Sequence, residues 1–178
     1  MINIDNDIYV LVKENNKAIL KYPRLNIETD AYIGKNGITN NKKEGDGKTP
    51  LGEFELGLIL VRNSNVENIH GLKYKVITEN MYWIDDSKSK YYNQLVDLYK
   101  VKKDWNSAEH LIDYPIQYEY FVEIKVNPNN IIGKGSAIFL HCSKDENTEG
   151  CIAVHREVMR KVIENIGVNT RIKICFCK

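Results

Sequence analysis

A histidine and a cysteine carry most of the chemistry that this sequence offers. His141 ends one apolar run, and Cys151 follows Gly150 ten residues later, at the start of a second apolar run. A free thiol has a pKa of about 8.5, so it is mostly protonated at neutral pH. A neighbouring imidazole can accept this proton and leave a thiolate, which is the nucleophilic form of cysteine. The pattern therefore favours an enzyme that forms a covalent bond to Cys151.

The residues beside this pair have expected supporting roles. Gly150 permits a tight turn, in which the backbone N–H groups of Gly150 and Cys151 would donate to an oxyanion. Cys142 follows His141 in an expected strand, so its side chain should point to the opposite face. Its backbone carbonyl is then free to hold the second ring nitrogen of His141. A purely structural role for both side chains stays open, since buried cysteines are often small core residues.

A zinc site is the main chemical alternative for the same segment. His141, Cys142, Cys151 and His155 are all residue types that bind zinc. Adjacent residues of a strand diverge, however, and the sequence has no CxxC motif. We therefore expect no metal and no cofactor.

The elements that must position these residues are mostly strands. The helical spacing of apolar residues over 155–166, ended by Gly167, predicts one substantial helix. The stretch 62–106 is polar and aromatic, and predicts short strands and loops with a helical turn near 106–111. β-Branched or alternating runs predict strands at 8–12, 18–22, 31–34, 53–56, 118–126, 136–141 and 170–177.

Composition limits the classes of function. The 178 residues are expected to form a single domain over 1–178, and the net charge of +1 does not favour a nucleic-acid binder. The four cysteines are expected to be free thiols. The N-terminal residues 1–7 lack the positive start and apolar block of a secretory signal, so a cytoplasmic location is possible for the chain as it stands. No apolar run reaches the about 18 residues of a membrane helix.

Three segments, taken in order, resemble the catalytic domain of the L,D-transpeptidase (YkuD) family, especially its short single-domain bacterial members. They are GDGKTPLGEFELG at 45–57, GKGSAIFLH at 133–141 and TEGCIA at 148–153. The resemblance covers about residues 30–165. It implies a mainly β, sandwich-like fold, with Cys151 as the nucleophile, His141 as the base and the carbonyl of Cys142 as the orienting group.

The same resemblance implies acyl transfer on peptidoglycan stem peptides in the cell envelope or outside the cell. A thioester forms on the cysteine as a terminal D-residue leaves, and the amine of a second stem peptide resolves it. An L,D-carboxypeptidase would use water instead, and a non-catalytic envelope-binding domain is the alternative from another class. No nucleic-acid partner is expected, and the oligomeric state stays open.

Four residues are candidate substrate contacts. Thr148 and Glu149 belong to the loop that carries the cysteine, and Trp83 and Tyr92 belong to the aromatic middle segment. Aromatic residues in loops can line a groove, but they can equally pack over a sheet as core residues. The broader family often has Ser-His-Gly-Cys and an arginine two residues after the cysteine. This chain has TEGC and Ala153, so its anchoring of substrate is expected to differ.

Overall fold

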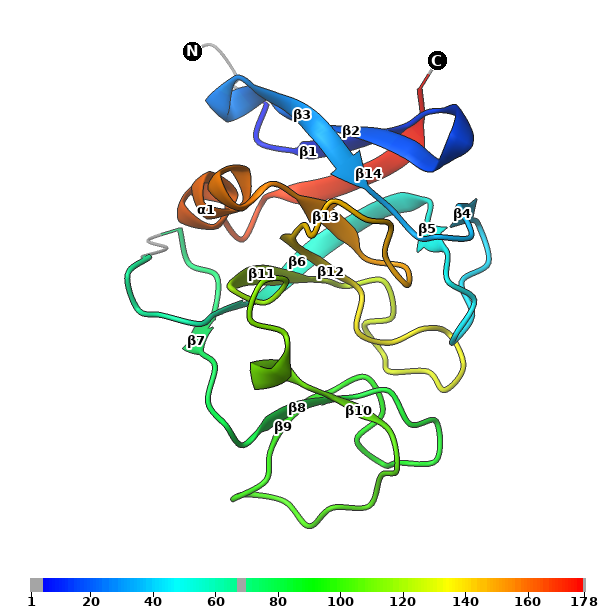
Figure 1. Cartoon of the computed structure of the whole chain (residues 1–178), viewed down its shortest axis with the longest axis vertical. Helices are drawn as coiled ribbons and strands as arrows, with labels where there is room; N and C mark the ends of the chain where they lie inside the picture. The colour runs from blue at the N-terminus through cyan, green and yellow to red at the C-terminus, as the bar shows by residue number, and fades with distance from the viewer. Residues whose placement is uncertain (1–4, 67–69, 178) are drawn as a thin grey trace.

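Strands make up most of the regular structure. The computed structural model describes residues 5–66 and 70–177, so the first four residues of the N-terminal segment discussed above lie outside it. Most strands gather in one large sheet, and a smaller sheet lies at the opposite end of the molecule from both termini (Figure 1). The mainly β fold expected from the sequence is confirmed.

The large sheet closes on itself. Eight strands form a ring in the order β11-β12-β13-β3-β2-β1-β14-β6, and β6 pairs back with β11. The strands are β1 (Ile8–Val12), β2 (Lys17–Tyr22), β3 (Ile27–Tyr32), β6 (Gly52–Val61), β11 (Tyr120–Ile124), β12 (Phe139–Cys142), β13 (Ile152–Val154) and β14 (Arg171–Phe176). A further strand, β7 (Tyr74–Val76), pairs with β6. The sheet is mixed, since β1 and β14 are parallel and so are β12 and β13.

The structure is therefore a closed, barrel-like sheet rather than the expected sandwich of two sheets. The ten-residue strand β6 explains this difference. Its first half pairs with β14, and its second half pairs with β11. One long strand thus joins what would have been two separate sheet edges. The sequence predicts only residues 53–56 of this strand.

Two smaller groups of strands lie outside the ring. β8 (Met81–Ile84), β9 (Leu95–Asp97) and β10 (Ala108–His110) form a three-stranded sheet, while β4 (Ile38–Thr39) pairs with β5 (Thr49–Pro50). Short 3-10 turns occupy Glu14–Asn16, Pro23–Leu25 and Leu111–Asp113. The helical turn expected near 106–111 thus begins later, because Ala108–His110 pairs with β8 as a strand.

The predicted helix is present as α1 (Arg156–Asn165). His155 caps its start by accepting a hydrogen bond from the backbone of Glu157 at 3.4 Å. Met159, Val162 and Ile163 are buried and pack into the core inside the closed sheet. Within the described ranges, no helix is long and apolar enough to cross a membrane.

Strand β12 separates two cores. Leu140 and Cys142 face the main core inside the closed sheet, while Phe139 belongs to a second core on the outer face. This second core also contains Trp83 of β8, so the three-stranded sheet packs over the outside of β12. By alternation His141 shares the outer face with Phe139. The site described next lies on this outer face.

Candidate active site

His141 and Cys151 line the same pocket, which has a volume of about 360 Å³. Parallel pairing of β12 with β13 brings them there, because Leu140 lies opposite Ile152 in the register. Other lining residues include Glu109, Tyr118, Thr148 and Glu149. The closed sheet therefore places a thiol and an imidazole in one cavity, as the sequence pattern predicts.

The sulfur of Cys151 lies in a tight backbone environment. The thiol donates to the carbonyl of Ala137 at 3.2 Å, and the N–H of Phe139 donates to the sulfur at 3.3 Å. Burial raises the pKa of Cys151 to about 12, and the nearby charge of Glu109 acts in the same direction. The resting group is thus the neutral thiol, with one backbone donor ready to stabilise negative charge on sulfur.

The ring of His141 is oriented by its neighbour. Nδ1 lies 2.8 Å from the backbone carbonyl of Cys142, so Nδ1 carries the hydrogen and Nε2 is left as the acceptor. The ring of Tyr118 meets it edge-to-face, with centroids 5.9 Å apart. Burial lowers the pKa of His141 to about 4. At neutral pH the imidazole is therefore uncharged and able to accept a proton.

The sequence suggests a thiolate beside an imidazolium, but both pKa shifts favour the neutral forms of Cys151 and His141. Burial penalises the thiolate and the imidazolium alike, so the resting pair is neutral. Proton transfer from Cys151 to His141 then belongs to the attack on a substrate rather than to the free protein. The side chain of Cys142 takes no part, since its sulfur lies 3.6 Å from the carbonyl of Tyr120 on the side of the main core.

The loop that carries Cys151 is braced by two threonines. Thr49 donates to the carbonyl of Gly150 at 2.9 Å and accepts from the N–H of Gly34 at 2.8 Å. Thr148 donates to the carbonyl of Cys151 at 2.6 Å and accepts from the N–H of Gly150 at 3.1 Å. The expected oxyanion donor at Gly150 is therefore already engaged, because the threonine hydroxyl satisfies it.

A buried ion pair lies next to the loop that carries Cys151. Lys42, whose side chain is 7% exposed, pairs with Asp46, which also accepts from two backbone N–H groups of its own loop. The lysine stem runs past Gly135, and its Nζ lies close enough to Gly150 to be 3.2 Å from a Cβ added there. Residue-type reasoning missed Lys42, Thr49 and Asp46 as supports, although the GDGKTP segment contains the latter two.

Gly150 offers a direct test of this bracing. Its φ is +141°, and an added Cβ would lie 3.0 Å from the carbonyl oxygen of Lys48 and 3.2 Å from Nζ of Lys42. We expect Gly150→Ala to lower the rate of Cys151 acylation about tenfold or more, with a stability loss of about 1–3 kcal/mol from backbone strain. Acylation kinetics by intact mass and a thermal melt measure the two effects.

Gly133→Ala is the matched control for Gly150→Ala. Gly133 also has a positive φ, +81°, but nothing lies within 4 Å of an added Cβ. We expect it to lose stability and keep its acylation rate. An unchanged rate in Gly150→Ala would show that the loop does not require this backbone geometry.

Trp83 and Tyr92, two of the predicted substrate contacts, are buried aromatic residues. Trp83 is 3% exposed and packs edge-on against Phe139, and Tyr92 is 2% exposed with its hydroxyl donating to Glu44. Neither lines the pocket of Cys151. The structure thus places both predicted substrate contacts in buried positions outside the pocket of Cys151.

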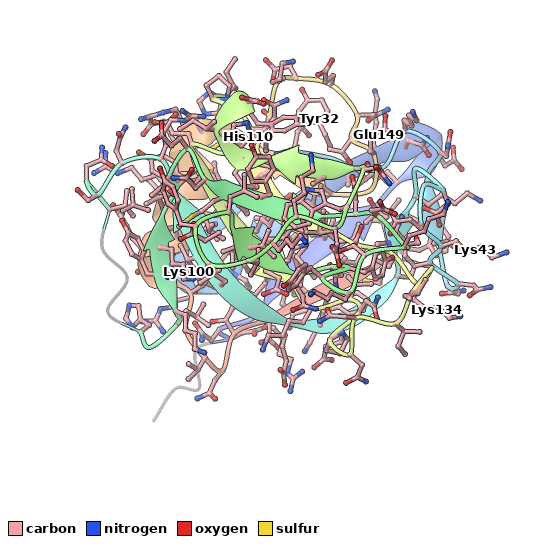
Figure 2. All side chains as sticks on the ribbon, turned by 90° about the horizontal axis from the view of Figure 1, so that it is seen from below. Tyr32, Lys43, Lys100, His110, Lys134 and Glu149 are labelled. Carbon is pink, nitrogen blue, oxygen red and sulfur yellow. The ribbon has the colours of Figure 1, made fainter. Side chains whose placement is uncertain are left out.

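Thr148 and Glu149 do line the pocket. Glu149, labelled in Figure 2, is mostly exposed and forms an ion pair with Lys35 at 2.7 Å. Thr148 has both its hydrogen-bonding roles filled by the loop itself. Glu149 is therefore the one of the two with a side chain open to a substrate.

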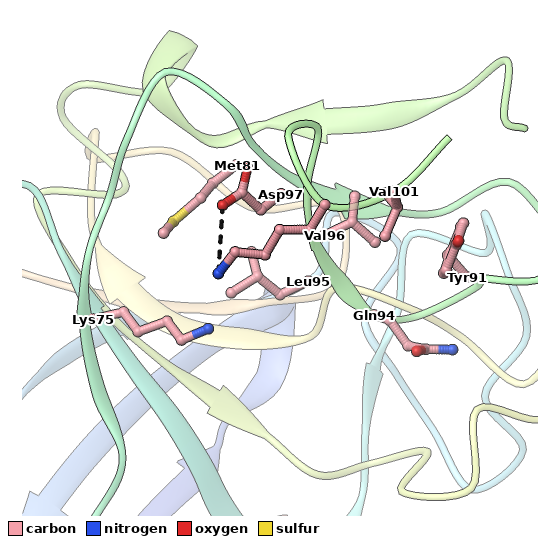
Figure 3. Close-up of a pocket in the computed structure, with 9 residues that line it drawn as sticks. Lys75, Met81, Tyr91, Gln94, Leu95, Val96, Asp97 and Val101 are labelled. Carbon is pink, nitrogen blue, oxygen red and sulfur yellow. Dashed lines mark ion pairs between the residues drawn. The ribbon is translucent and has the colours of Figure 1, made fainter. Parts of the chain in front are cut away.

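A second pocket, of about 370 Å³, lies beside β9 (Figure 3). Its lining includes Met81, Leu95 and Asp97, and Asp97 pairs with Lys100 at 3.9 Å. The lining contains neither a cysteine nor a histidine. Of these two pockets, only the first is lined by a thiol and an imidazole.

The zinc alternative does not fit the geometry. The sulfur atoms of Cys142 and Cys151 belong to different cores, and His155 is exposed at the start of α1. Across residues 5–66 and 70–177, no group of three His, Cys, Asp or Glu side chains could hold a metal ion.

We compared this chain with known protein families, curated proteins and solved structures. A solved structure from Bdellovibrio bacteriovorus, that of Bd1075, is 16% identical with a TM-score of 0.45, and the match covers 98% of this chain and 49% of that chain. The chain thus spans about half the length of that protein. No curated protein matches. Residues 1–174 match the family described as YkuD, the L,D-transpeptidase catalytic domain. This chain therefore belongs to the YkuD family of L,D-transpeptidase catalytic domains.

Proposed function

We propose that this protein is a cysteine-dependent acyltransferase that cross-links peptidoglycan stem peptides in the cell envelope. The observation that carries the proposal is that Cys151 and His141 line one pocket, with Nδ1 of the histidine held by a backbone carbonyl. This arrangement leaves Nε2 as a base for the thiol. Family membership supplies the substrate class.

The proposed reaction begins with attack of the Cys151 sulfur on the carbonyl before a terminal D-residue. Nε2 of His141 takes the thiol proton as the carbon–sulfur bond forms, so both groups start in the neutral state that burial favours. The N–H of Phe139 donates to the sulfur, and the N–H of Cys151 is the candidate oxyanion donor. The carbon–nitrogen bond then breaks, and His141 returns the proton to the departing amine.

The resulting thioester is resolved in a second acyl transfer. The amine of another stem peptide attacks it and loses a proton to His141, and a new amide forms that links the third residues of two stem peptides. The carbon–sulfur bond breaks in this step, and His141 returns the proton to the sulfur of Cys151. Water in place of the amine would give a trimmed peptide and an L,D-carboxypeptidase. The two activities share every residue of the first half-reaction.

Purified protein incubated with disaccharide tetrapeptides tests the proposal. We expect cross-linked dimers by liquid chromatography and mass spectrometry, and none with Cys151→Ala. Trimmed tripeptides without dimers would assign the carboxypeptidase instead. Absence of both products from folded wild-type protein would leave a non-catalytic envelope-binding domain.

A further inference from the structure

The pocket of Cys151 contains three carboxyl groups with different surroundings. Glu146 and Glu149 each have a lysine partner, at 3.4 and 2.7 Å. Glu109 accepts a hydrogen bond from the hydroxyl of Tyr118, and within the described part of the chain no lysine or arginine pairs with it. Glu109 is therefore the pocket carboxyl that lacks a cation.

Glu109 is held rigidly beside the reactive pair. It lies in β10, directly opposite Trp83 of β8 in the register. Its hydrogen-bond donor Tyr118 packs against Tyr114, with ring centroids 5.0 Å apart, and meets the ring of His141 edge-to-face. A ligand in this pocket would thus meet a fixed carboxyl and two aromatic rings together.

The surroundings of Glu109 favour a positive ligand. Burial raises the pKa of Glu109 to about 7, and the charges of Asp85 and Glu44 act in the same direction. One carboxyl oxygen of Asp85 is itself buried and has no hydrogen-bond partner among the residues that the structure describes. A partly buried carboxylate with only a phenol donor is costly, and an ammonium group would offset that cost. The rings of Tyr114 and Tyr118 would add a cation–π contribution.

We propose that Glu109 is a specificity residue that binds a primary ammonium group of the substrate beside the bond attacked by Cys151. The inference rests on the proposed acyltransferase function. The ammonium belongs either to the peptide that acylates Cys151 or to the amine that resolves the thioester. The chemistry of recognition is the same in both cases, and the two half-reactions distinguish them.

The test compares two tetrapeptides that differ only at the side chain of the third residue. One carries a free primary amine, and in the other this amine is acetylated. We expect wild-type protein to be acylated about tenfold to hundredfold faster by the free amine, and Glu109→Gln to lose this preference. Glu146→Gln is the control, since that carboxyl already has a lysine partner and its removal should leave the preference intact. Intact mass without an acceptor gives the acylation rates.

A second experiment tests whether the ammonium group belongs to the amine that resolves the thioester. In it, the thioester on Cys151 is formed first, and an amine is then added to resolve it. A defect of Glu109→Gln confined to this step would place the ammonium on the acceptor. A loss of equal size with both peptides, and no defect confined to resolution, would overturn the proposal, because it would show only a structural role. Wild-type protein acylated by neither peptide would instead refute the proposed function itself.

A pH series on wild-type protein gives a readout that does not depend on folding of a variant. The preference for the free amine should shrink as the pH falls below about 7, because Glu109 becomes protonated and loses its charge. The titratable groups that influence Glu109 are Tyr118, Asp85 and Glu44, and Tyr114 and Cys151 respond to its charge. Both peptides are attacked by the same Cys151, so its response cancels in the preference. A preference that stays constant from pH 5 to pH 8 would contradict a role for the Glu109 carboxylate.

Discussion

Replacing Cys151 with alanine is expected to abolish covalent labelling by a carbapenem, whereas wild-type protein should gain the mass of one intact carbapenem. The sulfur opens the β-lactam ring and keeps all its atoms as a thioester, which is the reaction that the resemblance to the family implies. We expect the labelling rate to fall by at least about 10³-fold, since no other group in the pocket can replace the thiol. Intact mass spectrometry of the denatured protein measures the adduct directly.

The other thiols provide the control for this experiment. Cys175 is exposed on β14, away from the pocket, so Cys175→Ala should be labelled like wild-type protein. A thermal melt of Cys151→Ala is needed, since this cysteine packs in the second core. An adduct that persists in Cys151→Ala would assign the nucleophile to another residue, and unlabelled wild-type protein would count against acyl chemistry at this site.

Strand β1 was predictable from its alternating pattern, whereas the second half of β6, which is buried on both faces, was not. In β1 the buried positions alternate, so Ile8, Val10 and Val12 identify the strand directly. The second half of β6 does not alternate, because Leu60 faces the second core while Ile59 and Val61 face the main core. Closure of the sheet depends on this half pairing with β11, a contact between segments about 60 residues apart. Local pattern alone could not show it.

The reactive pair was predictable for a different reason. His141 lies in β12, and Cys151 directly precedes the adjacent parallel strand β13, so their order and the apolar runs around them are informative. Glu109 reaches the same pocket only because the three-stranded sheet packs over β12, which no local pattern records. Residue type alone could not predict the role of Trp83, because an aromatic ring is equally suited to a substrate-binding groove and to a core. The neutral resting pair also escaped prediction, because the two pKa values depend on burial.

Replacing His141 with glutamine should slow acylation of Cys151 by about 10²- to 10⁴-fold at pH 7, the range for loss of a general base. The folded-state pKa of His141 is lowered to about 4, so the imidazole is neutral at pH 7 and is lost as a base only when the pH falls through about 4. With the acetylated tetrapeptide, whose acylation does not use the Glu109 carboxylate, the wild-type acylation rate should therefore stay level from pH 7 down to pH 5. In His141→Gln the proton must leave to solvent, so the rate should rise about tenfold per pH unit above pH 6, because hydroxide becomes the base.

His155→Gln separates the base from any general effect of losing a histidine. His155 is exposed at the start of α1 and lies outside the pocket, so its variant should follow the wild-type pH profile. The informative quantity is the difference between the two variants in how steeply the acylation rate rises with pH. Damage to the fold would instead lower the rate equally at every pH. A His141→Gln protein whose rate is level from pH 6 to pH 9 would exclude His141 as the base. A rate that rises only up to about pH 7 and then levels would instead indicate Glu109 as the base, because the pKa of this pocket residue is raised to about 7.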